Sequence, residues 1–141
     1  MEHGIRLSEL VEKMNLKNLT PEVETAEKEV NVPDVNRPAL QLAGFFDHFD
    51  SNRVQIIGNV EYRYVHTLSE KQRDEIYDKL LQHPIPCIVF CRNMEPDDNF
   101  LEKAVKYGVP VYKTAKQTSD FTAEIIRWMN VKLAPCIPIH G

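Results

Sequence analysis

Glycine is scarce in this sequence, and none of the glycines belongs to a phosphate-binding loop. Such a loop places two glycines four residues apart and follows them with Lys and Ser or Thr. That backbone lets several N–H groups converge on one anion. The 141 residues hold five glycines, and none begins this pattern: Gly4, Gly44, Gly58, Gly108 and Gly141. The sequence therefore excludes a P-loop nucleotide site within this segment.

Long apolar runs and excess positive charge are also missing. No run approaches the roughly 20 apolar residues that span a bilayer, so we expect no membrane segment. The start, residues 1–4, has neither the basic end nor the apolar stretch of a secretory signal, and we expect a cytoplasmic protein. The net charge of −4 gives no basic patch of the kind that neutralises nucleic-acid phosphates. We therefore expect neither a membrane nor a nucleic acid as partner.

Three cysteines, an odd number, do not indicate a disulfide framework. Cys87 and Cys91 share one face of a predicted strand but lie about 13 Å apart along it, too far for a disulfide or a shared metal ion. We predict that both are small residues of the core. No metal-ligand spacing is present among His3, His48, His66 and His83. We expect no metal or cofactor in this segment.

Strand and helix patterns alternate in the second half of the chain. Residues 86–90 and 109–112 read as apolar strands, and Ser69-Glu70-Lys71-Gln72 is a capping box that opens a helix. Gly108 is placed to end another helix, and Thr118 or Ser119 to cap the last one. Short connections between alternating elements predict parallel strands with right-handed crossovers. We predict an α/β domain over residues 1–133, a three-layer α/β/α sandwich with a mostly parallel sheet.

The segment 36–46 carries the most distinctive polar residues. Asn36 suits a helix N-cap, Pro38 is tolerated in a first turn, and Gly44 suits the left-handed position after a short helix. Arg37 has two readings. It binds an anionic ligand or a partner's carboxylate near a helix N-terminus, or it is tied to a local acidic group or carbonyl. The candidates for binding a ligand or partner are Asn36, Arg37 and Gln41.

The aromatic residues that follow have two readings as well. Phe45, Phe46 and Phe49 alternate with Asp47 and Asp50. Aromatic residues dominate the cores of protein interfaces, so the three rings could form a contact patch. They could equally pack beneath one face of the sheet.

The motif Asn36-Arg37-Pro38-Ala39-Leu40-Gln41-Leu42-Ala43-Gly44-Phe45-Phe46, together with the tail Leu133-Ala134-Pro135-Cys136-Ile137-Pro138-Ile139-His140-Gly141, resembles the amino-terminal domain of the HPr kinase/phosphorylase family. In that family the first segment reads NRP, Gly or Ala, LQLAG, an aromatic pair and an acidic residue. A tail of the pattern LAP…IHG leads into the catalytic domain. The family's domain is similar in fold to the amino-terminal domains of Mur ligases.

The resemblance implies a function for the parent protein. It implies an enzyme of bacterial carbon catabolite control that uses ATP or pyrophosphate, with Mg²⁺, to phosphorylate a serine of the phosphocarrier HPr. The same enzyme removes that phosphate by phosphorolysis. Residues 134–141 would then connect to an absent P-loop kinase domain, and His140 would be an active-site residue. For residues 1–133 the resemblance implies a regulatory or assembly role in a homo-oligomer, expected to be a hexamer.

A second reading is a free-standing ligand-sensing module of the same fold without catalysis. A third, a complete small hydrolase, lacks any nucleophile–base motif in the sequence. The presence or absence of a P-loop after Gly141 distinguishes the first two readings.

Overall fold

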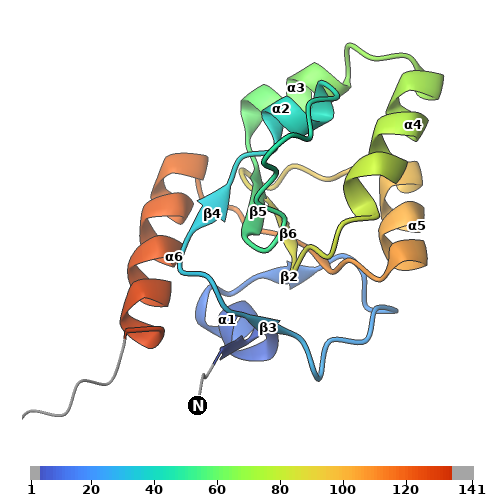
Figure 1. Cartoon of the computed structure of the whole chain (residues 1–141). Coiled ribbons are helices and arrows are strands. Elements are labelled where there is room, and N and C mark those ends of the chain that lie inside the picture. Colours follow the sequence, from blue (N-terminus) through green and yellow to red (C-terminus); the bar gives the residue numbers. More distant parts are fainter. Residues whose placement is uncertain (1–3, 135–141) are drawn as a thin grey trace, which may run out of the picture.

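A five-stranded, mostly parallel sheet forms the centre of the domain (Figure 1). The computed structural model describes residues 4–134. The strand order is β2-β7-β6-β5-β4, with β2 antiparallel at one edge and the other four parallel. All residues of the inner strands β5, β6 and β7 are buried, because helices cover both faces of the sheet. The strands are β2 (Lys17–Asn18), β4 (Val35–Asn36), β5 (Val54–Ile57), β6 (Ile88–Phe90) and β7 (Val111–Lys113).

Four helices cover one face of this sheet. Each of β4, β5 and β6 connects to its immediate parallel neighbour, and right-handed crossovers that advance in one direction place their helices on the same face. Buried Leu80, Phe100 and Ala104 pack there against Ile57 and Phe90 of the strands. The four helices are α2 (Ala39–Leu42), α3 (Asn59–Val65), α4 (Glu70–Leu81) and α5 (Asp98–Tyr107).

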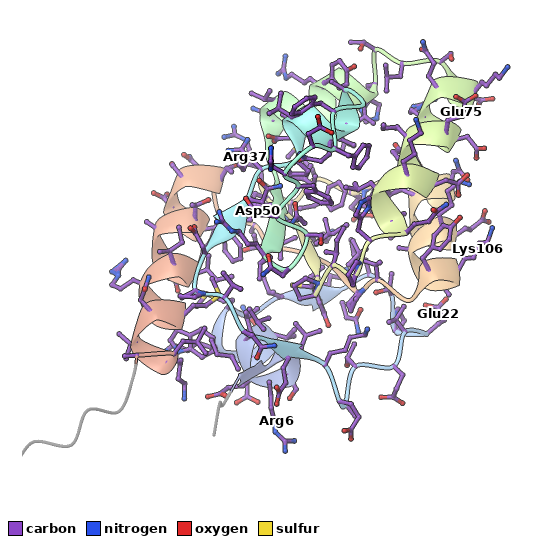
Figure 2. All side chains as sticks on the ribbon, in the orientation of Figure 1. Arg6, Glu22, Arg37, Asp50, Glu75 and Lys106 are labelled. Carbon is purple, nitrogen blue, oxygen red and sulfur yellow. The ribbon has the colours of Figure 1, made fainter. Side chains whose placement is uncertain are left out.

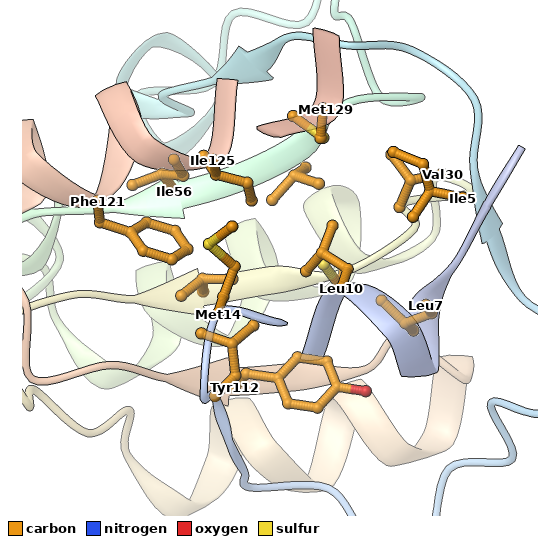
Figure 3. Close-up of a cluster of buried hydrophobic side chains, with 14 of the residues drawn as sticks. Ile5, Leu7, Leu10, Met14, Val30, Ile56, Tyr112, Phe121, Ile125 and Met129 are labelled. Atoms are coloured by element: carbon orange, nitrogen blue, oxygen red, sulfur yellow. The ribbon is translucent and has the colours of Figure 1, made fainter. Parts of the chain in front are cut away.

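Two helices, α1 (Leu7–Lys13) and α6 (Thr118–Lys132), cover the opposite face. Figure 3 shows their side chains meeting over the sheet, together with Ile5 and Val30 of a small antiparallel pair. That pair consists of β1 (Ile5–Arg6) and β3 (Glu29–Val30). The predicted three-layer α/β/α sandwich is confirmed. The buried residues that the two helices contribute are Leu7, Leu10, Met14, Phe121, Ile125 and Met129.

Of the three helix ends predicted in the second half of the chain, two are confirmed and one is wrong. The Gln72 N–H donates to Ser69 Oγ at 3.2 Å and the Ser69 N–H donates to Gln72 Oε1 at 3.0 Å, which is the capping box. Gly108 ends α5 with a φ of 72°. The N-cap of α6 is Gln117, without a side-chain bond, rather than Thr118 or Ser119. Thr118 is already helical and its hydroxyl lies beside Gly58, so it cannot serve as the cap.

The described cysteines are core residues, as predicted. Cys87 and Cys91 are completely buried and free, and burial raises the pKa of Cys87 to about 12. Residues 4–134 contain no group of three or more His, Cys, Asp and Glu side chains that could hold a metal ion. Within the same range, no helix combines the length and the apolar character that crossing a membrane would require.

Candidate functional site

The polar residues of segment 36–46 gather where the parallel strands end. Asn36 is the last residue of β4, Arg37 follows it, and Gly58 follows β5. Figure 2 shows Arg37 at this end of the sheet, near α2 and α3. In open α/β sheets, ligands bind outside the carboxyl ends of the strands. We call this region the carboxyl edge and take it as the candidate site.

Three amide side chains join β4, α2 and β5. Asn36 Nδ2 donates to Gln55 Oε1 at 2.8 Å and to Gln41 Oε1 at 3.3 Å. Gln55 Nε2 donates in turn to the carbonyl oxygens of Asp50 and Arg53, at 3.1 and 2.9 Å. Gln55 is fully buried and Gln41 is nearly so. An unpaired buried amide costs about 1–3 kcal/mol, so this network fixes the motif against the sheet.

The predicted role of Asn36 as a helix cap is wrong. Pro38 occupies the N-cap position of α2, and it makes no side-chain capping bond. Asn36 lies two residues earlier, in a strand, and its amide donates to the buried Gln55 instead. A polar residue inside the apolar strand Val54–Ile57 is the sequence signal that could have pointed to this partner.

Arg37 forms a two-pronged ion pair with Glu61. Its Nη2 lies 2.7 Å from Glu61 Oε1 and its Nε lies 3.1 Å from Oε2. The Glu61 side chain is only 2% exposed, whereas that of Arg37 is 39% exposed. Glu61 Oε1 also accepts the Gly58 N–H at 2.8 Å, at the start of α3. One carboxylate thus joins the segment after β4 to the first turn of α3, as in the reading that ties Arg37 to a local acidic group.

Gly58 allows these elements to approach one another. A Cβ at this position would lie 2.6 Å from Arg37 Nη2 and 2.8 Å from Thr118 Oγ1. Both distances are shorter than a Cβ atom tolerates, so any side chain would displace Arg37 or Thr118. The first residue of α6 and the guanidinium of Arg37 are therefore neighbours across a glycine.

The turn after β6 completes the carboxyl edge. Arg92 and Asn93 both have left-handed backbones, with φ of 59° and 58°. The Arg92 N–H donates to the Lys116 carbonyl at 2.9 Å, and the Asn93 N–H donates to the Thr114 carbonyl at 2.8 Å. Left-handed non-glycine residues are costly and persist where surrounding bonds hold them. The loops after β6 and β7 therefore support each other.

The chemistry available at this edge is limited. Burial raises the pKa of Cys91 to about 11, opposed by its hydrogen bond to Thr118, so the thiol stays protonated at neutral pH. A protonated thiol is a poor nucleophile. Arg37 uses two of its five N–H donors on Glu61, and its part-exposed guanidinium keeps others for an anion. The edge can bind or position a group more readily than it can transform one.

Of the three phenylalanines, two pack against the core and one is exposed, as a contact patch would require. Phe46 stacks on His83 with ring centroids 5.2 Å apart, and Phe49 meets the same imidazole edge-on at 5.0 Å. Both rings pack against the hydrophobic cluster beneath α4. Phe45, in contrast, is 50% exposed. Only Phe45 remains available for a contact patch.

Sequence reasoning missed two residues of the carboxyl edge. Glu61 and Gln55 were not predicted, although an acidic residue three positions after Gly58 is typical of a helix start. His140 lies outside the described residues, as does the connector from residue 135 onward.

The fold defines the class of this chain, an α/β domain whose polar residues at the carboxyl edge chiefly bind one another. The chain belongs to the family described as HPr Serine kinase N terminus, which matches residues 5–129. It is 54% identical over 139 residues to the HPr kinase/phosphorylase of Lachnoclostridium phytofermentans. The matched segment covers 99% of this chain and 45% of that protein. The corresponding protein of Caldicellulosiruptor bescii is 39% identical, over 96% of this chain and 43% of the relative.

The chain thus spans less than half the length of these curated relatives. A solved structure of the CBS and DRTGG domains from the regulatory region of Clostridium perfringens pyrophosphatase, complexed with diadenosine tetraphosphate, resembles it in fold. The TM-score is 0.59 at 16% identity, over 85% of this chain and 45% of the other. At that identity the likeness concerns the fold alone.

Proposed function

We propose that this chain is the amino-terminal domain of a bifunctional HPr kinase/phosphorylase, with a regulatory or assembly role. The family match over residues 5–129 carries this proposal. The relatives named for that activity are more than twice as long as the matched segment. The catalytic half would therefore follow this domain, and phosphoryl transfer would take place there.

The proposed reaction uses the serine hydroxyl of HPr as the nucleophile. In the kinase direction, its oxygen attacks the terminal phosphorus of ATP, or a phosphorus of pyrophosphate, and the serine proton passes to a base. The P–O bond to the rest of the donor breaks, and ADP or inorganic phosphate leaves. In the reverse direction, an oxygen of inorganic phosphate attacks the phosphorus of the phosphoserine and forms pyrophosphate. The bond from phosphorus to the serine oxygen breaks, and that oxygen takes up a proton to become the hydroxyl again. The nucleotide and Mg²⁺ belong to the catalytic half. The first half binds no cofactor of its own in this scheme.

Features of residues 4–134 support a regulatory or assembly role, rather than a catalytic one, for this half. It supplies a rigid α/β body with buried amide and ion-pair networks at the carboxyl edge. Asn36, Arg37 and Gln41 act there first as structural residues, and Arg37 keeps an exposed side for an anion or a partner carboxylate. The proposed protein is cytoplasmic and homo-oligomeric, assembled as a hexamer around its catalytic halves.

Expression of the complete gene tests this proposal. The protein that it encodes, incubated with ATP, Mg²⁺ and HPr, should produce phosphoserine on HPr. Added inorganic phosphate should then remove that group and release pyrophosphate, which enzymatic coupling can quantify. A gene without a P-loop after codon 141, and a protein without either reaction, would contradict the proposal and favour the ligand-sensing module.

A further inference from the structure

A groove of about 410 Å³ lies between α5 and the segment that follows β2. The segment after β2 contributes Leu19 and Glu22, and Figure 2 shows Glu22 near α5. The helix contributes a stripe with the i, i+3, i+4, i+7 spacing of a single helix face: Asp98, Leu101, Glu102 and Val105. We call these six residues the α5 groove.

The α5 groove combines aliphatic surface with charge of one sign. Its aliphatic residues are only half-buried, so each leaves part of its side chain in the groove: Leu19, Leu101 and Val105. The other three are exposed carboxylates, and none of the six residues is basic. Among residues 4–134, these carboxylates take part in no ion pair: Glu22, Asp98 and Glu102.

We propose that the α5 groove binds a segment of another protein in which bulky apolar side chains are flanked by Lys or Arg. Burial of aliphatic surface favours an apolar occupant, and three unpaired carboxylates attract cations and repel an acidic partner. The same charges exclude nucleic acids and anionic membrane surfaces, whose phosphates they would repel. The inference goes beyond phosphoryl transfer and does not depend on it.

The length of the groove suits a short helix as the bound segment. From Asp98 to Val105 the stripe rises about 10 Å, which corresponds to about two turns of a second helix. An amphipathic helix that lies in a groove presents apolar residues three or four positions apart. Basic residues on either side of that apolar stripe would then face the carboxylates of the groove.

The wall that follows β2 is already held in place. The Leu19 N–H donates to the Val111 carbonyl at 2.9 Å, and the Val111 N–H donates to Thr20 Oγ1 at 2.9 Å. Asn18 Oδ1 accepts the Thr20 N–H at 2.8 Å, and the Val23 N–H donates to the Thr20 carbonyl at 3.0 Å. Binding would therefore not have to order this segment, which reduces the entropy cost of association.

The α5 groove is separate from the carboxyl-edge network. It lies beside β2, at the opposite edge of the sheet from β4 and the Arg37–Glu61 pair. Figure 1 shows α5 and α6 on opposite sides of the domain, in agreement with their packing on opposite faces of the sheet. A partner in the groove would therefore leave the contacts of Arg37 unchanged.

Titration of the isotope-labelled 141-residue chain with a short synthetic peptide tests the proposal. The peptide carries two leucines one helical turn apart with lysines around them. We expect a dissociation constant of about 0.1 mM at low salt, with amide NMR shifts concentrated at residues 19–22 and 98–105. Addition of NaCl to about 0.5 M should weaken binding about fivefold, because salt screens exposed charges.

Glu102→Lys should weaken binding of this peptide about fivefold or more, because it places a cation among the carboxylates of the groove. Glu75→Lys is the matched control. It makes the same change of charge at an exposed position in the middle of α4, outside the groove, and should leave binding unchanged. Thermal unfolding of both variants near the parent's Tm verifies that they are folded.

Absence of shifts in the α5 groove would overturn the proposal, and so would equal weakening by Glu75→Lys. Undiminished binding of a second peptide with serines in place of the leucines would reduce the effect to charge attraction and also overturn it. If the complete protein failed to bind the peptide while the 141-residue chain bound it, the groove would belong to the rest of the same chain instead. None of these measurements uses phosphoryl transfer, so their failure and that of the kinase/phosphorylase assignment are distinguishable.

Discussion

Replacement of Arg37 by alanine should destabilise this domain by about 2–3 kcal/mol. The change leaves the Glu61 carboxylate, only 2% exposed, without its cation. Loss of one partner from a fully buried ion pair costs about 3–5 kcal/mol, and hydrogen bonds to charged groups contribute about 1.5–3 kcal/mol. Arg37 is 39% exposed, which places the expected cost at the lower end of this range because water screens the pair. The corresponding fall in Tm is roughly 6–10 °C by thermal unfolding.

Arg53→Ala is the matched control for this measurement. Arg53 also lies next to β4 and β5, but its partners Asp34 and Asp50 are both 51% exposed and lie 3.4 and 3.7 Å away. Exposed pairs contribute about 0–1 kcal/mol, so this variant should unfold close to the parent's Tm. The double variant Arg37→Ala/Glu61→Gln should recover part of the loss, because it removes the buried charge.

An unchanged Tm for Arg37→Ala would contradict this structural role. If the same variant altered oligomerisation or phosphoryl transfer in the complete protein, Arg37 would belong to a ligand or partner site. A lower Tm with unaltered assembly and activity would reject that second reading. Melting curves of the 141-residue chain and assays of the complete protein therefore separate the two readings.

His140→Ala should lower both the kinase and the phosphorylase rates of the complete protein. The resemblance to the family implies that this imidazole would lie beside the nucleotide phosphates in the complete protein. An imidazole titrates near ~6.5 and can exchange a proton with a developing charge at neutral pH. General acid–base catalysis contributes about 10²–10⁴-fold, so we expect a loss of that order in both directions. The Tm of the amino-terminal domain should not change.

His66→Ala is the control for this prediction. His66 is exposed at the end of α3, and its Nδ1 lies 2.7 Å from the Tyr62 carbonyl oxygen. This variant should keep both rates. Undiminished activities of the His140→Ala protein, measured on HPr and on phosphoserine-HPr, would remove His140 from the active site.

The layers of this fold could be predicted because the sequence patterns that indicate its helices and strands are local. The apolar run before Cys91, the capping box at Ser69 and the glycine at 108 each act within a few residues, and each is where the prediction placed it. Strand order was not predictable, since it depends on which strands pair across long separations. The order β4 to β7 follows the chain, with the antiparallel β2 added at the far edge.

The sequence singled out Asn36, Arg37 and Gln41 but did not predict the contacts that their side chains make. Asn36 was expected to cap a helix because capping is a local rule. Its side chain instead donates to the buried amide of Gln55, 19 residues away. Arg37 pairs with the carboxylate of Glu61, 24 residues away on α3, and the absence of a side chain at Gly58 leaves room for this approach. Partners at such separations depend on the crossover geometry of the sheet, which sequence patterns do not specify.

A complete protein from which residues 1–133 have been deleted tests the division of roles most directly. If this domain has a regulatory or assembly role while catalysis belongs to the other half, the shortened protein should still form phosphoserine on HPr with ATP and Mg²⁺. Its oligomeric state or its response to phosphate should differ from that of the complete protein. Mass spectrometry of HPr gives the readout. A shortened protein that is folded but forms no phosphoserine, or a 141-residue chain that forms it alone, would contradict the proposed division.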